Sequence, residues 1–144
     1  EEVTFKGTIR TLYKEDRALV EDRIKRIAHE ITSANRTSAS VEYNNYYPAV
    51  INNENVTNKV RESAKKIIST QDIVEIKEPA MTAEDMSYYL NEVPGTFFIL
   101  GSSKKADDGN IYPHHHPKFD IDESVLWIGT ATFIQFIYDH LIQH

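Results

Sequence analysis

Phe97-Phe98-Ile99-Leu100 is a run of four apolar residues between the turn Val93-Pro-Gly-Thr96 and a polar loop that begins at Gly101. A short apolar run that is bounded by turn residues is typical of a strand at the centre of a sheet. Working outward, alternating and β-branched residues predict further strands at 3–12, 39–43 and 73–76. The chain is therefore expected to build a sheet around residues 97–100.

Helical periodicity fills the stretches between these predicted strands. Apolar residues recur at helical spacing from about Asp16 to Asn35, and again after Asn52 or Asn53, which are good N-cap types. Thr82-x-x-Asp85 has the spacing of a capping box and predicts a short helix after it. A broad apolar face predicts a last helix from about Glu123 to Leu141. Helices that alternate with strands in this order predict an α/β fold.

Composition excludes several classes of protein. The 144 residues include 16 basic and 22 acidic side chains for a net charge of −6, with no basic face for nucleic acid. No apolar run approaches the ~18 residues that a membrane span needs. The absence of cysteine favours a cytoplasmic location. The chain opens with Glu1-Glu2-Val3, which is not a signal peptide. Because it lacks an initiating methionine, we expect a processed chain or a piece of a longer protein.

The segment from Ile111 to Glu123 holds three adjacent histidines between two prolines, followed by three acids. This pattern fits a metal site, a proton shuttle or a solvated loop. A neutral imidazole is a common metal ligand. Successive side chains of an extended segment point to opposite sides, and proline restricts the residue before it to extended conformations. On this argument the three successive side chains cannot all face one point, and His115 could face a site while His114 and His116 point away from it or flank it.

Three charged residues elsewhere are further candidates. Glu84 and Asp85 could act as acid or base catalysts or as ligands, although acids in a first helical turn commonly complement the helix dipole. Arg10 could bind a substrate carboxylate through its two-pronged guanidinium, or could be a surface arginine at a strand edge.

Several motifs together resemble one family. They are Gly7-Thr-Ile-Arg10 with Arg23-Ile-x-Arg-Ile-Ala28, Tyr47-Pro-Ala-Val-Ile-Asn-Asn53, Met81-Thr-Ala-Glu-Asp-Met-Ser-Tyr-Tyr89, Val93-Pro-Gly-Thr-Phe-Phe98, and His115-His-Pro-Lys-Phe-Asp-Ile-Asp-Glu123. In this order they resemble the aminoacylase/carboxypeptidase metallopeptidases. The last three resemble its amidohydrolase branch, which includes hippurate hydrolases and N-acyl-amino-acid amidohydrolases. The resemblance covers essentially the whole chain, although Thr82 stands where many members carry glycine.

The resemblance implies a fold and a domain division. Residues 1–52 would be the second half (β-α-β) of a ferredoxin-like (βαββαβ) lid and dimerisation domain. Residues 53–144 would be the C-terminal part of a zinc-aminopeptidase-like α/β catalytic domain. Members are larger than this chain, so the upstream metal ligands and the general base are expected in a missing N-terminal half.

The resemblance also implies the chemistry. Two divalent ions, zinc or manganese, would hydrolyse an amide that lies next to a free carboxylate. His115 matches the final metal ligand, no catalytic residue falls within the chain, and Glu84 lies on a turn along the substrate groove. Arg10 and Glu84 are the substrate-binding candidates.

The sequence thus predicts the C-terminal portion of a two-metal amidohydrolase for N-acyl amino acids or small peptides, inactive as this chain alone. Its expected partners are the small-molecule substrate, the missing N-terminal half and a second copy in a homodimer, with neither nucleic acid nor membrane. The alternative is a non-catalytic binding or dimerisation module left by truncation.

Overall fold

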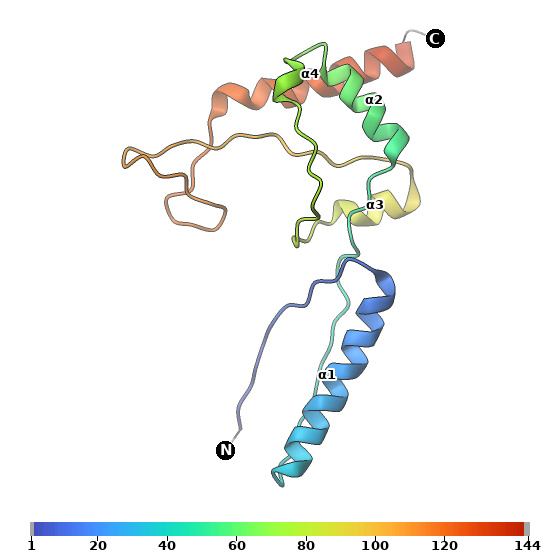
Figure 1. The fold of residues 1–144 in the computed structure, drawn as a ribbon, viewed down its shortest axis with the longest axis vertical. Coiled ribbons are helices and arrows are strands. Elements are labelled where there is room, and N and C mark those ends of the chain that lie inside the picture. The colour runs from blue at the N-terminus through green and yellow to red at the C-terminus, as the bar shows by residue number, and fades with distance from the viewer. Residues whose placement is uncertain (1, 143–144) are drawn as a thin grey trace. The chain divides into compact units, whose positions relative to one another are not determined.

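A computed structural model describes residues 2–142 of the chain, and helices are its main regular elements (Figure 1). In chain order they are α1 (Lys14–Ala34), α2 (Glu54–Ala64), the 3-10 turn η1 (Thr70–Asp72), α3 (Met86–Glu92), the 3-10 turn η2 (Glu123–Val125), α4 (Leu126–Ile137) and the π-helical turn η3 (Tyr138–Ile142).

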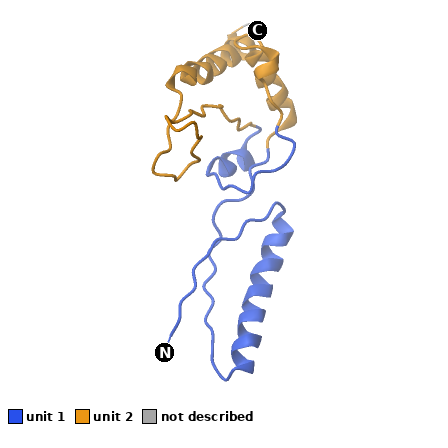
Figure 2. Cartoon of the chain, turned by 60° about the vertical axis from the view of Figure 1, so that its left-hand side comes forward, with its two compact units in different colours: residues 1–51, 76–94 blue, residues 52–75, 95–144 orange. Residues whose placement is uncertain are grey.

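The chain forms two compact units (Figure 2). Unit 1 contains residues 1–51 and 76–94, with α1 and α3. Unit 2 contains residues 52–75 and 95–144, with α2 and α4. The predicted division into a lid domain at 1–52 and a catalytic segment at 53–144 stays a prediction, because it concerns the domains of a larger protein.

The predicted α/β fold, half of a ferredoxin-like lid followed by part of a zinc-aminopeptidase-like catalytic domain, is wrong for this structure. Within residues 2–142 the only β-pairing is two isolated antiparallel bridges, Ser103 with Ile121 and Lys105 with Ile111. The stretches 3–12, 39–43, 73–76 and 97–100 do not form strands. A strand is stabilised by hydrogen bonds to a neighbouring strand, so strand-forming composition alone does not make a sheet.

The first predicted helix is confirmed in unit 1, and it begins two residues earlier than expected. Helix α1 follows Tyr13, which makes no side-chain capping bond, and the Asn35 side chain closes it by donating to Ile31 O at 2.8 Å. Arg17 ties the helix to the segment that returns beside it, because its guanidinium donates to Tyr46 O at 2.9 Å and to Tyr47 O at 3.2 Å.

The predicted short helix after Thr82-x-x-Asp85 is confirmed as α3, but the capping box that was expected to open it is wrong. Helix α3 begins only at Met86, and the Asp85 side chain makes no capping bond. The turn before the helix is instead closed by Ser87, whose buried hydroxyl donates to Glu84 O at 2.6 Å.

The second predicted helix is confirmed in unit 2, with Asn53 as its cap. The Asn53 side chain accepts a hydrogen bond from the Val56 N–H at 3.1 Å, and its backbone N–H donates to Gly95 O at 2.8 Å. The neighbouring Asn52 makes two further bonds to Phe97. Two motifs that lie about 45 residues apart in the sequence are thus joined through backbone and side-chain amides.

Helix α2 packs against the C-terminal helical segment, whose predicted bounds are confirmed as η2, α4 and η3 in succession. Asp139 of η3 accepts hydrogen bonds from Ser63 at 2.8 Å, from Lys66 at 2.7 Å and from Gln135 at 2.8 Å. Its side chain is only 8% exposed, so this polar cluster lies inside the contact between the helices.

Apolar side chains are poorly covered. Among residues 2–142 no hydrophobic side chain is buried, and the three buried residues are Ser63, Ser87 and Thr132. Trp127 is 57% exposed and Phe133 is 60% exposed, although Phe133 packs against Phe98 with ring centroids 5.4 Å apart. The apolar faces of the helices are therefore largely open to solvent in this chain.

One helical segment, Glu123–Ile142, is long and apolar enough to cross a membrane by length and composition alone. The expectation that no segment of the chain reaches that length was wrong. The same test is passed by core helices of soluble proteins, so the expected lack of a membrane partner stays a prediction.

Candidate functional site around the histidine turn

The histidine segment is held at its base by the two β-bridges. Ser103 pairs with Ile121 and Lys105 pairs with Ile111, and the Asp122 N–H donates to Ser102 O at 2.9 Å. Residues 112–120 therefore leave and rejoin the same short stretch of backbone, 102–105. This closure at the base makes the histidines part of a tied loop.

The three histidines lie in a turn and not in the extended segment that the prolines were expected to impose. The His116 N–H donates to Pro113 O at 3.2 Å, which closes a four-residue turn over His114 and His115. His115 has φ 70°, the left-handed value that the third position of a type II turn requires. Histidine is among the few non-glycine residues that are enriched at positive φ.

His114 and His116, the two outer histidines, each contact a neighbouring aromatic ring. The ring of His114 meets the ring of Phe119 edge to face, with centroids 4.7 Å apart. The ring of His116 stacks on Tyr112 with centroids 4.2 Å apart and planes inclined by 17°.

The middle histidine differs from both. All three histidines are exposed, and within residues 2–142 the His115 imidazole makes no hydrogen bond or ring contact. Among the described residues, His115 is thus the one of the three whose ring has neither kind of contact, while His114 has a ring contact but no hydrogen bond.

The loop also carries a local charge network. Asp108 accepts from the Tyr112 hydroxyl at 2.6 Å and from Lys118 Nζ at 3.4 Å. The Tyr112 hydrogen bond, followed by the Asn110 N–H, holds the pKa of the Asp108 carboxyl below its ordinary value. The Asp108 carboxylate is therefore occupied by hydrogen bonds within the loop.

Asp120 and Asp122, which follow the histidines, also accept hydrogen bonds from nearby residues. Asp120 accepts from Lys104 Nζ at 2.5 Å, and this bond lowers the pKa of Asp120 and raises the pKa of Lys104. Asp122 accepts from the Ser124 hydroxyl and N–H, which lowers the pKa of Asp122. Because these bonds lower the pKa of both carboxyls, Asp120 and Asp122 are ionised at neutral pH and do not serve as acids there.

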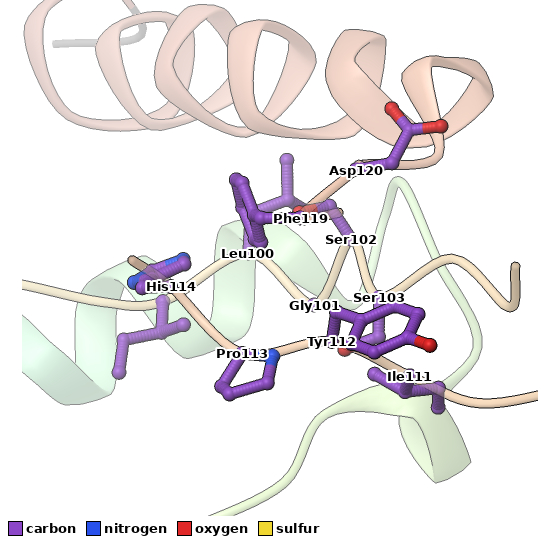
Figure 3. A pocket seen from close by; sticks show the side chains of 11 residues that line it. Leu100, Gly101, Ser102, Ser103, Ile111, Tyr112, Pro113, His114, Phe119 and Asp120 are labelled. Atoms are coloured by element: carbon purple, nitrogen blue, oxygen red, sulfur yellow. The ribbon is translucent and has the colours of Figure 1, made fainter. Parts of the chain in front are cut away.

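An open hollow of about 450 Å³ lies beside the turn (Figure 3). His114 and Leu100 line one side of it, and Tyr112 and Ile111 line the other. The lining is mainly apolar and aromatic, with Ser102, Ser103, His114 and Asp120 among its polar members.

The two substrate-binding candidates lie in unit 1, whereas His115 lies in unit 2. The Arg10 guanidinium donates to Thr8 Oγ1 at 3.2 Å and is exposed. Glu84 is half-buried at the turn before α3, where its carbonyl accepts the Ser87 hydroxyl. The roles assigned to Arg10, Glu84 and His115 stay predictions.

A complete metal site is not assembled by the described residues. Within 2–142 no group of three or more His, Asp or Glu side chains could hold one ion. A single free imidazole at His115 fits the ligand set of a divalent ion but does not complete it. Further ligands would have to come from outside these residues.

Sequence reasoning missed the residues that shape the turn, namely Tyr112, Asp108 and Lys118. The available signal was an aromatic residue four positions before His116, with a turn-forming proline between them. That spacing permits a ring contact across a turn but does not require it.

Comparison with known proteins relates the chain to a family and to several relatives. The model of the family described as Peptidase family M20/M25/M40 matches residues 3–139. Thermostable carboxypeptidase 1 of Saccharolobus solfataricus is 36% identical over 90% of this chain. N-acetyl-L-cysteine deacetylase of Bacillus subtilis is 32% identical over 86%, and N-acetyldiaminopimelate deacetylase of Priestia megaterium is 31% identical over 97%.

The chain spans about a third of the length of these relatives, from 28% to 35% of each. No solved structure matches it.

Proposed function

The chain belongs to peptidase family M20/M25/M40, and from this we propose that it is a portion of a metal-dependent amidohydrolase that cleaves N-acyl amino acids or small peptides. The observation that carries the proposal is the family match over residues 3–139. The relatives are named as a carboxypeptidase and as deacetylases of N-acetylated amino acids. Both activities hydrolyse an amide bond beside an amino-acid unit, which is the substrate class proposed here.

His115 is the proposed metal ligand in the chain. Its imidazole is exposed and uncommitted on a turn, while both neighbouring histidines are held by aromatic rings. When bound, zinc or manganese in such a site supplies a Lewis acid that polarises the amide carbonyl and activates water. The remaining ligands and the general base are proposed to lie in the rest of the protein, so this chain alone is proposed to be inactive.

Arg10 and Glu84 keep their proposed roles toward the substrate. The Arg10 guanidinium is exposed and could form two parallel hydrogen bonds with the substrate carboxylate. Glu84 is proposed to line the groove in which the substrate lies. A cytoplasmic location and the lack of a nucleic-acid partner also stay predictions.

The alternative is a non-catalytic binding or dimerisation module. The observation that favours it is the open apolar surface of α4, on which Trp127 and Phe133 are more than half exposed. The gene upstream of Glu1 discriminates the two functions. A frame that encodes a histidine–acid metal motif and an adjacent Glu-Glu pair supports the enzyme, whereas a start codon near Glu1 supports the module.

The direct test uses the complete protein that carries this chain. Metal content is measured by mass spectrometry, and hydrolysis is measured with hippurate and with N-acetyl amino acids. His115→Ala should lose bound metal and most of the activity. His29→Ala removes another exposed histidine, on α1, and should leave both unchanged. Full metal content and activity in His115→Ala would overturn the assignment of His115.

A further inference from the structure

We propose that Tyr112 and His116 are positioning residues, whose stacked rings hold the turn that presents His115. The inference rests on the proposed metal role of His115. It goes beyond that role because it assigns a function to the rings of Tyr112 and His116. The stack is close and nearly parallel, with centroids 4.2 Å apart and planes inclined by 17°. The stack joins Tyr112, which precedes Pro113, to His116, whose N–H closes the turn.

The hydrogen bonds of His116 also keep it from competing for the metal. The Lys118 N–H donates to His116 Nδ1 at 3.1 Å, so the lone pair of that nitrogen is in use. An imidazole that accepts at Nδ1 carries its proton on Nε2 when it is neutral. Neither nitrogen of His116 then offers a free lone pair to a metal, although His116 is adjacent to His115.

Tyr112 is itself fixed from the other side of the loop. Its hydroxyl donates to Asp108 at 2.6 Å. Lys118 Nζ lies 3.4 Å from the same carboxylate and 5.3 Å from the centroid of the Tyr112 ring, where a cation is attracted by the aromatic face. The ring on which His116 stacks is therefore anchored near the Lys105–Ile111 bridge at the base of the loop.

The backbone of His115 makes this support necessary. Its φ of 70° is an uncommon conformation for a residue with a side chain, and such conformations persist where surrounding contacts hold them. The turn bond from the His116 N–H to Pro113 O and the stack on Tyr112 both act on the residue that follows His115. Without the stack, the turn can relax and the His115 imidazole changes direction.

The test measures metal affinity of the complete protein by competition with a chelator, for zinc and for manganese. Tyr112→Ala and His116→Ala should each weaken binding by about tenfold, the low end of the effect of removing a partner that orients a ligand. Tyr112→Phe and His116→Phe preserve a ring at each position. His116→Phe should restore most of the affinity, and Tyr112→Phe, which loses the hydroxyl bond to Asp108, should restore part of it. A loss of general stability would explain neither recovery.

A second readout needs no metal. In metal-free protein with labelled histidines, the imidazole protons of His116 should show the upfield shift that a stacked tyrosine ring causes. The shift should disappear in Tyr112→Ala and remain in Tyr112→Phe. The melting temperature of the metal-free variants, measured in parallel, shows whether any change in affinity comes from the turn or from global destabilisation.

The outcomes separate the two proposals. If His115→Ala keeps its metal, the proposed function fails, whatever Tyr112 and His116 do. If His115→Ala loses metal while Tyr112→Ala and His116→Ala bind as tightly as the unaltered protein, the positioning inference is wrong and His115 stands. Should Tyr112→Ala fail to fold, the comparison of His116→Ala with His116→Phe decides: equal affinities overturn the inference, and a difference of about tenfold supports it.

Discussion

Asn52 and Phe97 are joined by two hydrogen bonds that imitate the pairing of adjacent strands. The Asn52 Nδ2 donates to Phe97 O at 2.9 Å, and the Phe97 N–H donates to Asn52 Oδ1 at 2.8 Å. A side-chain carboxamide thus satisfies the backbone of Phe97, the first residue of the apolar segment 97–100, which finds no strand partner within residues 2–142. The same contact fixes the start of α2, because Asn53 is its N-cap.

Replacing Asn52 should therefore loosen the start of α2. Asn52→Ala removes both bonds to Phe97 and should lower the free energy of unfolding by about 1–2 kcal/mol, the sum of two ordinary hydrogen bonds. Asn52→Asp keeps only the acceptor and places a carboxylate against Phe97 O, so it should also destabilise. Chemical denaturation of the complete protein measures both. Asn44→Ala, which removes an exposed asparagine bonded to Glu42, serves as the matched control.

An Asn52→Asp variant as stable as the unaltered protein would contradict this interpretation. It would mean that the donor bond from Nδ2 to Phe97 O contributes nothing.

The cluster around Asp139 predicts a pH dependence. The hydrogen bonds from Lys66 and then from Ser63 lower the pKa of Asp139 from 3.8 to about 2. A carboxyl whose pKa is lower in the folded state stabilises the fold above its unfolded pKa. The contact between α2 and the C-terminal helices should thus be fully stabilised above about pH 4, and this contribution should be lost as the pH falls through about 2.

The measurement is the titration of the Asp139 carboxyl carbon by NMR, together with the melting temperature, from about pH 5 down to about pH 1, so that both the ordinary carboxyl range and the lowered midpoint are covered. Asp139→Asn should remove the acid resonance and flatten the melting profile in that window. A midpoint for Asp139 near 3.8 would show that Lys66 and Ser63 do not hold it in solution.

The helices could be predicted from the sequence because their signals are local. Asn53 as a cap and the apolar spacing after it placed α2 correctly, since capping and periodicity act within a few residues. The sheet could not be predicted in the same way. The composition of Phe97–Leu100 suits a strand, but strand formation depends on a partner elsewhere, and in this chain the Asn52 side chain takes that place.

In the candidate site, too, the local features could be predicted from the sequence and the contacts that depend on folding could not. The three adjacent histidines were visible in the sequence, and the resemblance singled out His115 among them. The turn was not predicted, because the extended conformation expected before Pro117 says nothing of the positive φ at His115. The stack of Tyr112 on His116 depends on how the turn folds back, which spacing alone does not determine.

The 144-residue chain alone should be catalytically silent. Within residues 2–142 no three potential ligands gather around one point, and one imidazole does not build a two-metal site. With zinc or manganese added, hydrolysis of hippurate and N-acetyl amino acids should not exceed that of a His115→Ala control. Metal-dependent turnover above the control would sink the proposal that the rest of the protein is required.

The same chain should associate with itself or depend on the rest of the protein. Its large apolar side chains are open to solvent, with Phe5 at 91% and Leu141 at 73% exposed, and exposed apolar surface favours association. Light scattering should report oligomers, and a dye that binds apolar surface should fluoresce. A sharp monomer that melts cooperatively and binds no dye would contradict this expectation.

At Gly129 the local geometry decides whether a substitution raises or lowers the free energy of unfolding. It lies inside α4, where glycine costs about 0.5–1 kcal/mol relative to alanine because of its backbone freedom. A Cβ at this position would lie 3.6 Å from Leu100 Cδ2, which is an ordinary van der Waals contact. Gly129→Ala should therefore stabilise the complete protein by about that amount, whereas the extra methyl groups of Gly129→Val should press on Leu100 and remove the gain.

Thermal and denaturant unfolding measure these changes. Gly7→Ala is the matched control, because Gly7 lies outside any helix and a Cβ there would meet nothing within 4 Å. If Gly129→Ala destabilises the protein while Gly7→Ala does not, α4 and Leu100 must approach more closely than 3.6 Å in solution.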